Sequence, residues 1–559
     1  MKNRDLPSAV DVVVVGSGAA ALSAALKAAG EGLSVAVLEK SEWLGGTSAM
    51  SGAGTWIPAN HLMKQAGFHD SPAEALEYLR ATAPEGWAQT EDHLWRAFAN
   101  AAPELLKFLE QRTPLKFELM PEPDPFTELP GGKKYGRMLS PSPLSKRLIG
   151  SYGARVRPST LPHRFSYGDN FKHDIFHHPI RSCLAMAPTL LKRFLRNEWG
   201  QGTSLVIGLL KGCLDSGCSI FTDAEAKRLV QVPSGAISGV EVLYNGSRHL
   251  VSARFGVVIA TGGFEWDSNR LAKHFPGANG LLGSPRSNTG DGHRMAEEVG
   301  ASLERMDQAN IYPVLPTRYQ GKLHGLPITF QATPNCIVVN SQAKRFCSEY
   351  DFNLGESLDT RDVTNGIPRN CPSWIIGDQR FVNSSPAIRF YAAKLKGWLI
   401  KAGSLEELSR KIGLPTQELI KTVNLWNGYC ASNHDADFKR GESVWERYKS
   451  HWTDGDVKNP ALGTICKGPF YAVRFDRSML GTKGGPRTNE FGEVLRRDGS
   501  VIEGLYCAGV AMANCIGTRA VGPGTTIGPC MTWGYICADN IVKKLKSVAQ
   551  TPEVLRFSK

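Results

Sequence analysis

The feature that most constrains this chain is a β-branched run that leads directly into a glycine turn and an apolar helix. Residues 12–15 (VVVV) predict a buried strand, residues 16–21 (GSGAAA) a tight turn, and the following Ala/Leu-rich stretch a helix. A second apolar strand, residues 34–38, ends in Glu39. This order of strand, turn, helix, strand and acid predicts a Rossmann-like dinucleotide-binding fold.

The residue types in this unit fit a dinucleotide. Gly16 and Gly18 let backbone N–H groups approach a pyrophosphate, and Ala21 lets the helix pack closely on the strands. Glu39 can accept hydrogen bonds from an adenosine ribose. The first group of predicted cofactor-binding residues is therefore Gly16, Gly18, Ala20, Ala21, Glu39 and Lys40.

Further glycine-rich turns predict a cofactor larger than a nicotinamide dinucleotide. Residues 44–54 (LGGTSAMSGAG) can wrap a flavin closely, and a predicted strand at 254–260 runs into the turn TGGF, which we place beside the cofactor. The second group of predicted cofactor-binding residues is Gly45, Gly46, Thr47, Ser48, Ser51, Gly52, Gly54, Ala260, Thr261, Gly262, Gly263, Asp291, Gly509, Gly524, Thr526 and Ile527.

At 559 residues the chain exceeds the size of a single hydrophobic core. The region 313–465 has a mixed pattern, with a helix opened by the capping pair Ser404 and Glu407 and a second helix at about 415–431. The fold class predicted is α/β: a Rossmann-like FAD-binding domain (1–312 and 466–559) with an inserted α+β catalytic cap domain (313–465).

Composition excludes some classes of protein. With 42% hydrophobic and 21% charged residues the chain is an ordinary globular one, and its charge of +12 is dispersed, without a nucleic-acid-binding motif, so we expect no nucleic-acid partner. Twelve Cys without a CxxC pair predict reduced thiols and a cytoplasmic location. The apolar run at 12–15 is too short for a signal peptide or a membrane span.

The region of about 140–200 is basic with interspersed apolar residues and looks like a segment added to the first domain. We interpret it as a peripheral membrane contact on the inner face of the membrane, or equally as a solvated face or a subunit contact. The cluster of His173, Asp174, His177 and His178 lacks a second ligand pair at recognisable spacing, so no metal is expected.

Four motifs resemble a known superfamily. GGTSAMSGAG, ATGGF, NTGDGHRMA and GLYCAGV resemble the FAD-dependent fumarate reductases and 3-ketosteroid dehydrogenases over almost the whole chain. GPGTTIGP followed by MTWGY is most similar to the ketosteroid dehydrogenase branch. The resemblance implies noncovalent FAD, since residues 44–51 contain no linking histidine. It also implies dehydrogenation of a hydrophobic 3-oxosteroid to a Δ1 or Δ4 double bond conjugated to the 3-keto group.

The resemblance implies roles for individual residues. Tyr350, after RFCSE, matches the tyrosine that removes a proton while a neighbouring carbon gives a hydride to flavin N5, and Gly524 matches the glycine whose N–H binds the substrate carbonyl. Two family tyrosines are replaced, by Phe126 and Ala520. The predicted substrate-binding residues are Phe126, Tyr312, Tyr350, Ala520 and Gly522.

Tyr471 and Arg519 are candidates for the missing carbonyl donor, although a packed tyrosine and an arginine that binds an FAD phosphate explain them equally well. Tyr312 stands where fumarate reductases carry a substrate-binding histidine, so a dicarboxylate site is incomplete. An enone or enoate reductase and a noncatalytic flavin- or lipid-binding protein stay open as alternatives. The electron acceptor stays open as well.

Overall fold

The predicted strand–turn–helix–strand unit lies at the centre of the largest sheet of the protein. It consists of β1 (Ala9–Val15), α1 (Ala19–Gly30) and β2 (Val35–Leu38), with β1 and β2 parallel. A computed structural model describes residues 5–450 and 458–550. The Rossmann-like unit predicted from the sequence is confirmed.

Segments from distant parts of the chain complete this sheet. Its main path has the order β22-β23-β11-β1-β2-β8, and β10 and β9 extend it from β11 as an antiparallel meander. β11 pairs in parallel with both β1 and β23, so the predicted strand at 254–260 is confirmed as the end of a longer one. The bounds are β8 (Ser219–Phe221), β9 (Ala224–Gln231), β10 (Ile237–Tyr244), β11 (Ser247–Ile259), β22 (Glu493–Leu495) and β23 (Val501–Cys507).

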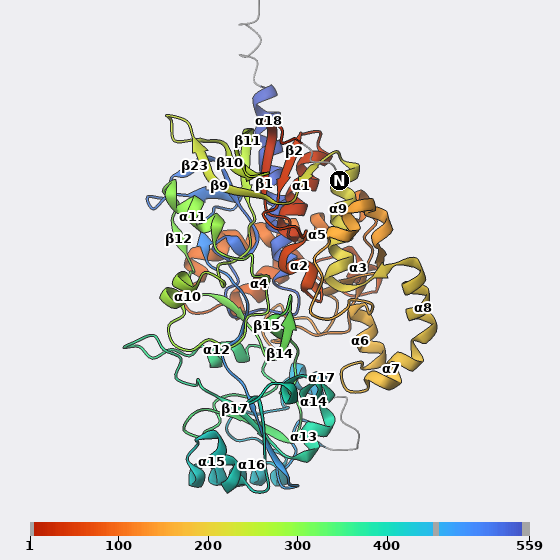
Figure 1. Cartoon of the computed structure of the whole chain (residues 1–559), viewed down its shortest axis with the longest axis vertical. Coiled ribbons are helices and arrows are strands. Elements are labelled where there is room, and N and C mark those ends of the chain that lie inside the picture. Colours follow the sequence, from red (N-terminus) through yellow and green to blue (C-terminus); the bar gives the residue numbers. More distant parts are fainter. Residues whose placement is uncertain (1–4, 451–457, 551–559) are drawn as a thin grey trace, which may run out of the picture.

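Helices cover the sheet and bury its apolar strands. α1 packs against α18 (Ile527–Gln550) and α9 (Gln201–Asp215), and α18 in turn contacts α5 (Ala88–Arg112). The β1 residues 12–14 are fully buried, as expected for a strand with both faces covered. Figure 1 shows the red N-terminal strands beside the blue C-terminal helix, so the chain returns to its first domain.

The cap is an antiparallel sheet with helices on it, in the order β16-β17-β19-β18. The strands are β16 (Cys336–Val339), β17 (Trp374–Gly377), β18 (Leu399–Ala402) and β19 (Phe470–Arg474). Successive β16 residues join two different apolar clusters, Cys336 and Val338 on one face and Ile337 and Val339 on the other. This alternation follows from the two-residue period of a strand.

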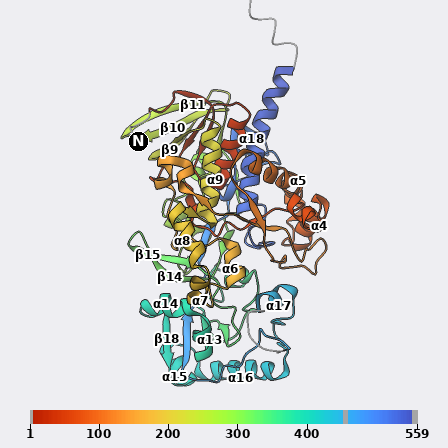
Figure 2. The same ribbon diagram turned by 90° about the vertical axis from the view of Figure 1, so that its right-hand side faces the viewer.

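The cap helices lie at the end of the molecule opposite the large sheet (Figure 2). They are α13 (Gln379–Ser384), α14 (Pro386–Tyr391), α15 (Leu405–Ile412), α16 (Thr416–Ser432) and α17 (Val444–Ser450). Ser404 caps α15, and α16 confirms the second predicted helix. The predicted boundary at 465 needs correction, because β19 is still part of the cap sheet and only its pairing with β17 and β18 reveals this.

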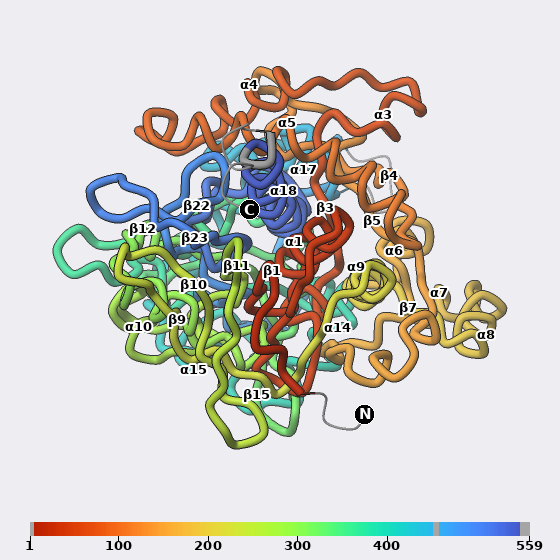
Figure 3. Tube along the Cα trace, turned by 90° about the horizontal axis from the view of Figure 1, so that it is seen from above, coloured from red at the N-terminus to blue at the C-terminus, as the bar shows by residue number. Residues whose placement is uncertain are grey.

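The basic region of about 140–200 contains α6 (Tyr167–His173), α7 (Pro179–Ala185) and α8 (Ala187–Arg196). α7 and α8 project from the side of the first domain in two perpendicular views (Figures 1 and 3). The segment returns to the domain through β7 (Glu198–Trp199), which pairs with β6 (Leu144–Ser145). It is therefore an outward excursion from the Rossmann-like domain.

Candidate functional site

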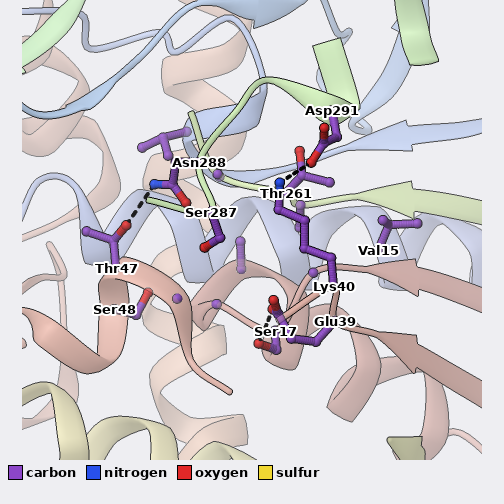
Figure 4. Close-up of a pocket in the computed structure, with 18 of the residues that line it drawn as sticks. Val15, Ser17, Glu39, Lys40, Thr47, Ser48, Thr261, Ser287, Asn288 and Asp291 are labelled. Atoms are coloured by element: carbon purple, nitrogen blue, oxygen red, sulfur yellow. Dashed lines mark hydrogen bonds and ion pairs between the residues drawn. The ribbon is translucent and has the colours of Figure 1, made fainter. Parts of the chain in front are cut away.

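A pocket opens at the carboxyl ends of β1, β2 and β11, where parallel α/β sheets bind ligands. Figure 4 shows polar side chains from several segments pointing into it. The predicted cofactor-binding residues in its lining are Gly16, Gly18, Ala20, Glu39, Lys40, Gly46, Thr47, Ser48, Ala260, Thr261, Gly262, Asp291 and Gly509. The sequence therefore located about half of this lining.

The turn after β1 leaves room for a ligand backbone. Gly16 has φ +109°, and a Cβ atom there would lie 2.3 Å from the carbonyl oxygen of Ala260. α1 begins two residues after Ser17, with Gly18 as its N-cap, so the first N–H groups of the helix face the pocket with the positive end of the helix dipole. This turn and the start of α1 (residues 16–19) form a cradle that fits the pyrophosphate of a dinucleotide.

Glu39 is held in place at the end of β2. Its carboxylate accepts hydrogen bonds from the Ser17 hydroxyl (2.5 Å) and from the Ser41 N–H (2.9 Å), and the residue is buried. Ser17 also accepts a hydrogen bond from the Gly45 N–H at 3.0 Å. Ser17 was missed as a site residue, although its place between two motif glycines could have indicated it.

An ion pair between Lys40 and Asp291 forms another part of the pocket wall. Lys40 pairs with Asp291 at the start of α11 (Asp291–Glu298) and donates a hydrogen bond to the Thr289 hydroxyl (2.7 Å). Burial disfavours the charged form of Asp291, but Lys40 and Arg294 keep the pKa of its carboxyl below the usual value. Asp291 is therefore charged at neutral pH, and Lys40 is positioned by it (Figure 4).

The turn before α2 (Gly46–Met50) connects to the NTGDG motif. The Asn288 side chain donates hydrogen bonds to the Thr47 hydroxyl (3.1 Å) and to Glu265 (2.7 Å). The Ser48 hydroxyl accepts one from the Ala19 N–H at 3.0 Å, at the first turn of α1. Asn288 and Glu265 were not predicted, and their contact depends on a fold that brings positions 47, 265 and 288 together.

The other predicted cofactor-binding residues lie outside this pocket lining. Ala21 is buried in α1, where it packs as the sequence implied, and Gly263 is in close contact with Thr482. The full set is Ala21, Gly45, Ser51, Gly52, Gly54, Gly263, Gly524, Thr526 and Ile527. Their roles toward a cofactor stay predictions.

The C-terminal glycine motif lies directly on the second small-residue stretch. Gly524 has φ +87°, and a Cβ atom there would lie 2.6 Å from the backbone nitrogens of Thr55 and Trp56. The Trp56 N–H donates a hydrogen bond to the Gly524 carbonyl oxygen at 3.2 Å. The two segments that the sequence assigned to the flavin are thus neighbours, although they are far apart in the chain.

A buried charge network supports this junction. Arg137 forms ion pairs with Asp70 (2.7 Å) and Asp124 (2.9 Å), and Asp124 accepts a hydrogen bond from the Trp56 indole (2.9 Å). Burial raises the pKa of Asp124, which Arg137 and Trp56 oppose. The Trp56 ring in turn leaves no space for a side chain at Gly522. The position of the glycine motif therefore depends on a network that sequence patterns did not reveal.

Tyr78 lies between the two positions at which family tyrosines are replaced. Its hydroxyl donates a hydrogen bond to the Val521 carbonyl oxygen (2.8 Å) and accepts one from the Phe126 N–H (3.3 Å). Ala520, the residue before Val521, exchanges two hydrogen bonds of 2.9 Å with the Asn353 side chain. Phe126 and Ala520 are thus close to the glycine motif, and neither side chain carries a hydrogen-bonding group.

Tyr350 is enclosed within the cap. Its ring lies on the Arg440 guanidinium, at 4.9 Å from the ring centroid, and the residue is only 2% exposed. Burial raises the pKa of its hydroxyl, and Arg440 offsets this only in part. The hydroxyl has no hydrogen-bond partner among the described residues. The role of Tyr350 as base stays a prediction.

The remaining predicted catalytic residues are engaged elsewhere. Tyr471 lies in β19, and its hydroxyl donates a hydrogen bond to Gln379 (2.8 Å), which fits the packed-tyrosine alternative, while its role as carbonyl donor stays a prediction. Arg519 forms an ion pair with Glu356 (2.8 Å). Tyr312 shares a hydrogen bond with Thr329 (2.7 Å) and, unlike Tyr350, has a partly exposed side chain.

The described residues contain neither a metal-binding cluster nor a membrane-spanning helix. Within 5–450 and 458–550, no group of three or more His, Cys, Asp or Glu side chains is arranged to hold a metal ion. In the same part of the chain, no helix combines the length and apolarity that a membrane crossing requires.

Comparison with known proteins places this geometry in a family. Residues 11–527 match the FAD binding domain family. The chain is 35% identical to a 3-oxosteroid 1-dehydrogenase of Mycobacterium tuberculosis, over 95% of this chain and 98% of that protein. It is 34% identical to a 4-oxocyclohexanecarboxylate 2-dehydrogenase of Sinomonas cyclohexanicum, over 96% and 93%.

A solved structure of a relative has the same fold as this chain. The 3-ketosteroid delta1-dehydrogenase of Sterolibacterium denitrificans, in complex with 1,4-androstadiene-3,17-dione, is 30% identical and superposes with a TM-score of 0.85 over 96% of this chain and all of that one. The dinucleotide cradle, the family match and this fold agree with one another. The chain therefore belongs to the FAD-binding flavoproteins of the fumarate reductase and 3-ketosteroid dehydrogenase superfamily, as its motifs predicted, and it is an oxidoreductase with FAD as its cofactor.

Proposed function

We propose that this flavoprotein removes two hydrogens from adjacent carbons of a ring that carries a ketone, with a 3-oxosteroid as the substrate. The observation that carries the proposal is the end-to-end similarity to dehydrogenases of oxo-substituted rings, together with a pocket that fits the dinucleotide. The product has a C=C bond, Δ1 or Δ4, conjugated to the ketone.

In this proposal, some residues of the chain bind the cofactor and others bind and orient the substrate. Glu39 binds the adenosine ribose, and the N-terminus of α1 faces the pyrophosphate. FAD, when bound, accepts the hydride and so supplies the two-electron chemistry. The Gly524 N–H polarises the ketone oxygen, which acidifies the neighbouring C–H bond. Residues 51–54 wrap the flavin without a covalent bond.

Anaerobic mixing of the FAD-loaded protein with a saturated 3-oxosteroid is expected to bleach the flavin absorbance within one turnover. Mass spectrometry of the product is expected to show the loss of two hydrogens, and the position of the new double bond distinguishes Δ1 from Δ4. A steroid with a hydroxyl in place of the ketone is the control, since it lacks the group that acidifies the C–H bond.

The same experiment tests two alternatives. Photoreduced enzyme that is reoxidised by enones or enoates, without any bleaching of oxidised enzyme by 3-oxosteroids, would identify a C=C reductase. A holoprotein that is inert toward 3-oxosteroids, enones and 4-oxocyclohexanecarboxylate would identify a noncatalytic flavin- or lipid-binding protein. Either result contradicts the proposed function.

We further propose a peripheral membrane contact through α7 and α8. Five large apolar side chains are exposed there, between 59% and 77%, beside basic residues: Ile180, Leu184, Leu191, Phe194 and Leu195. Arg181, Lys192 and Arg196 are exposed on the same two helices. An apolar face with cationic neighbours suits the interface of an anionic bilayer. The cysteines, none of them in a disulfide, support a reducing compartment and so the cytoplasmic face.

Flotation with vesicles of phosphatidylglycerol and phosphatidylcholine tests this contact. The double variant Leu191→Glu/Phe194→Glu is expected to lower the bound fraction about tenfold or more, since each apolar side chain contributes about 1.5–3 kcal/mol when buried. Val363→Glu, at a residue that is 90% exposed on the cap, is the matched control. Equal flotation of wild type and double variant would refute the contact.

A further inference from the structure

A second pocket adjoins the dinucleotide pocket at the residues that follow Glu39. It has a volume of about 350 Å³, and the two pockets share Ser287 in their linings (Figure 4). A pocket of this size can hold a small-molecule ligand. We call it the arginine pocket, and its lining includes Ser41, Trp43, Arg157, Arg286, Ser287 and Gln320.

Segments that are distant in the chain form the walls of the arginine pocket. Residues 155–157 are joined to Leu44 by backbone hydrogen bonds of 2.7 and 2.9 Å. The turn of the hairpin at residues 314–327 contributes another wall. The Tyr319 hydroxyl of this hairpin donates a hydrogen bond to the Pro158 carbonyl oxygen at 2.9 Å. These contacts hold the two walls together, so the fold itself fixes the shape of the pocket.

Arg157 brings a buried positive charge to this pocket. The residue is only 3% exposed, and its guanidinium donates a hydrogen bond to the Ser41 hydroxyl at 2.8 Å. Its Nε atom has no hydrogen-bond partner, and its guanidinium forms no ion pair with a carboxylate, within residues 5–450 and 458–550. A buried cation without a counter-charge is costly, so an anion in the pocket would stabilise it.

Arg286 brings a second positive charge from a different segment. Its guanidinium lies over the Trp266 ring, 4.4 Å from the centroid, and donates a hydrogen bond to the Leu323 carbonyl oxygen at 3.0 Å. Like Arg157, it forms no ion pair with a carboxylate of the described chain. Both guanidinium groups are therefore held in place by neutral partners, and the positive charge of each is left for a ligand.

The chemistry of the pocket favours a phosphate group. A phosphate has several charged oxygens and can accept hydrogen bonds from two guanidinium forks at once, whereas a carboxylate is matched by one. Two carboxylates, Glu42 and Asp223, also line the pocket, but both residues are exposed. Asp223 is already shared with Arg155 at 3.8 Å. Their repulsion is screened by water more than the attraction of the buried Arg157.

We propose that the arginine pocket binds a phosphate group through Arg157 and Arg286, either as inorganic phosphate or as part of a nucleotide, and that this ligand slows the loss of FAD. The site is separate from the FAD pocket and from the substrate, so the proposal does not depend on which ketone the enzyme oxidises. Trp43, which is partly exposed in the lining, could stack on the base of a nucleotide.

A chain of hydrogen bonds connects the arginine pocket to the cofactor site. Arg157 donates to the Ser41 hydroxyl, and the Ser41 N–H donates to the Glu39 carboxylate at 2.9 Å. Glu39 is the residue that we expect to bind the adenosine ribose. A phosphate that immobilises Arg157 therefore also restrains Ser41 and Glu39. Because such coupling is reciprocal, bound FAD should in turn strengthen the binding of phosphate.

Calorimetric titration of the FAD-loaded protein with inorganic phosphate, at constant ionic strength, is expected to show saturable binding at one site. Arg286→Gln is expected to weaken it about tenfold or more, the usual effect of losing a hydrogen bond to a charged group. Arg286 has no contact with Ser41 or Glu39, so the flavin content should not change. Arg318→Gln, at an exposed residue of the same hairpin outside the lining, is the matched control for the lost charge.

Asp223→Asn is expected to tighten phosphate binding by about two- to fivefold, since it removes an exposed negative charge from the lining. The backbone of Asp223 has φ +58°, which asparagine tolerates, so the fold should not be disturbed. A parallel titration with AMP distinguishes the two sources of the phosphate group. Tighter binding of AMP than of phosphate supports a nucleotide ligand, and equal binding supports inorganic phosphate.

The rate of FAD release into a large excess of an apoflavoprotein that captures FAD tests the coupling. Phosphate is expected to slow this release in the wild type and in Arg318→Gln, but not in Arg286→Gln. Three results overturn the inference: no saturable binding to the FAD-loaded protein, equal affinity of wild type and Arg286→Gln, or binding of phosphate by the apoprotein alone. The last result would assign the two arginines to the FAD site itself. None of the three affects the proposed dehydrogenation.

Discussion

Gly16→Ala is expected to abolish FAD binding, with an affinity at least about 100-fold below that of the wild type, which corresponds to about 3 kcal/mol. The new Cβ atom would lie 2.3 Å from the Ala260 carbonyl oxygen, a backbone atom that cannot rotate away. The residue would also have to adopt φ +109°, which is strained for any side chain. The strand-to-helix turn must therefore shift, and its N–H groups leave the pyrophosphate.

The measurement is the flavin content of the purified protein, followed by titration of the apoprotein with FAD and detection by flavin fluorescence. Gly32→Ala is the matched control, since Gly32 lies in the same βαβ unit with φ +94° but has no atom within 4 Å of an added Cβ. Gly32→Ala therefore introduces the backbone strain but no steric clash. A yellow Gly16→Ala protein with normal affinity would contradict the assignment of the cradle.

Arg137→Met is expected to destabilise the protein by about 3–5 kcal/mol, because it leaves two buried carboxylates, Asp70 and Asp124, without their cation. The side chain of Arg137 is 1% exposed, so water cannot replace it. Thermal or urea unfolding measures the loss. Arg80→Met removes an exposed pair with Asp92 and should cost at most about 1 kcal/mol.

The loss of stability in Arg137→Met should depend on pH. Burial raises the pKa of Asp124, and Arg137 is the group that opposes that rise most strongly. A carboxyl whose pKa is higher in the folded state stabilises the fold at low pH and loses that contribution as the pH rises through its folded pKa. The deficit of Arg137→Met should therefore be larger at about pH 8 than at about pH 5. An equal loss of stability at both pH values would contradict this account of the ion pairs between Arg137, Asp70 and Asp124.

Local signals were sufficient for the Rossmann-like unit. The run of valines, the glycines and the spacing to Glu39 follow from backbone geometry within 31 residues (Ala9–Glu39), so β1, α1 and β2 could be predicted from the sequence. About half of the residues that line the pocket were predicted, from this unit and from the other glycine-rich motifs. The resemblance of these motifs to known flavoproteins added the cofactor and the reaction class.

The cap boundary and the surroundings of Tyr350 could not be predicted in the same way. β19 joins the cap through pairing with β17 and β18, which end at Gly377 and Ala402, and no local pattern records this pairing. Tyr350 follows a motif-like stretch in sequence, but only the tertiary structure shows that its ring lies 4.9 Å from the Arg440 guanidinium.

The sequence by itself determined that this chain binds a dinucleotide, because that site is built from one turn whose glycines and helix start are consecutive residues. The tertiary structure alone decided which charged groups support the C-terminal glycine motif, because Asp70, Asp124 and Arg137 meet only through folding. Ion pairs depend on distances of a few ångströms, and between segments these are set by packing rather than by spacing along the chain.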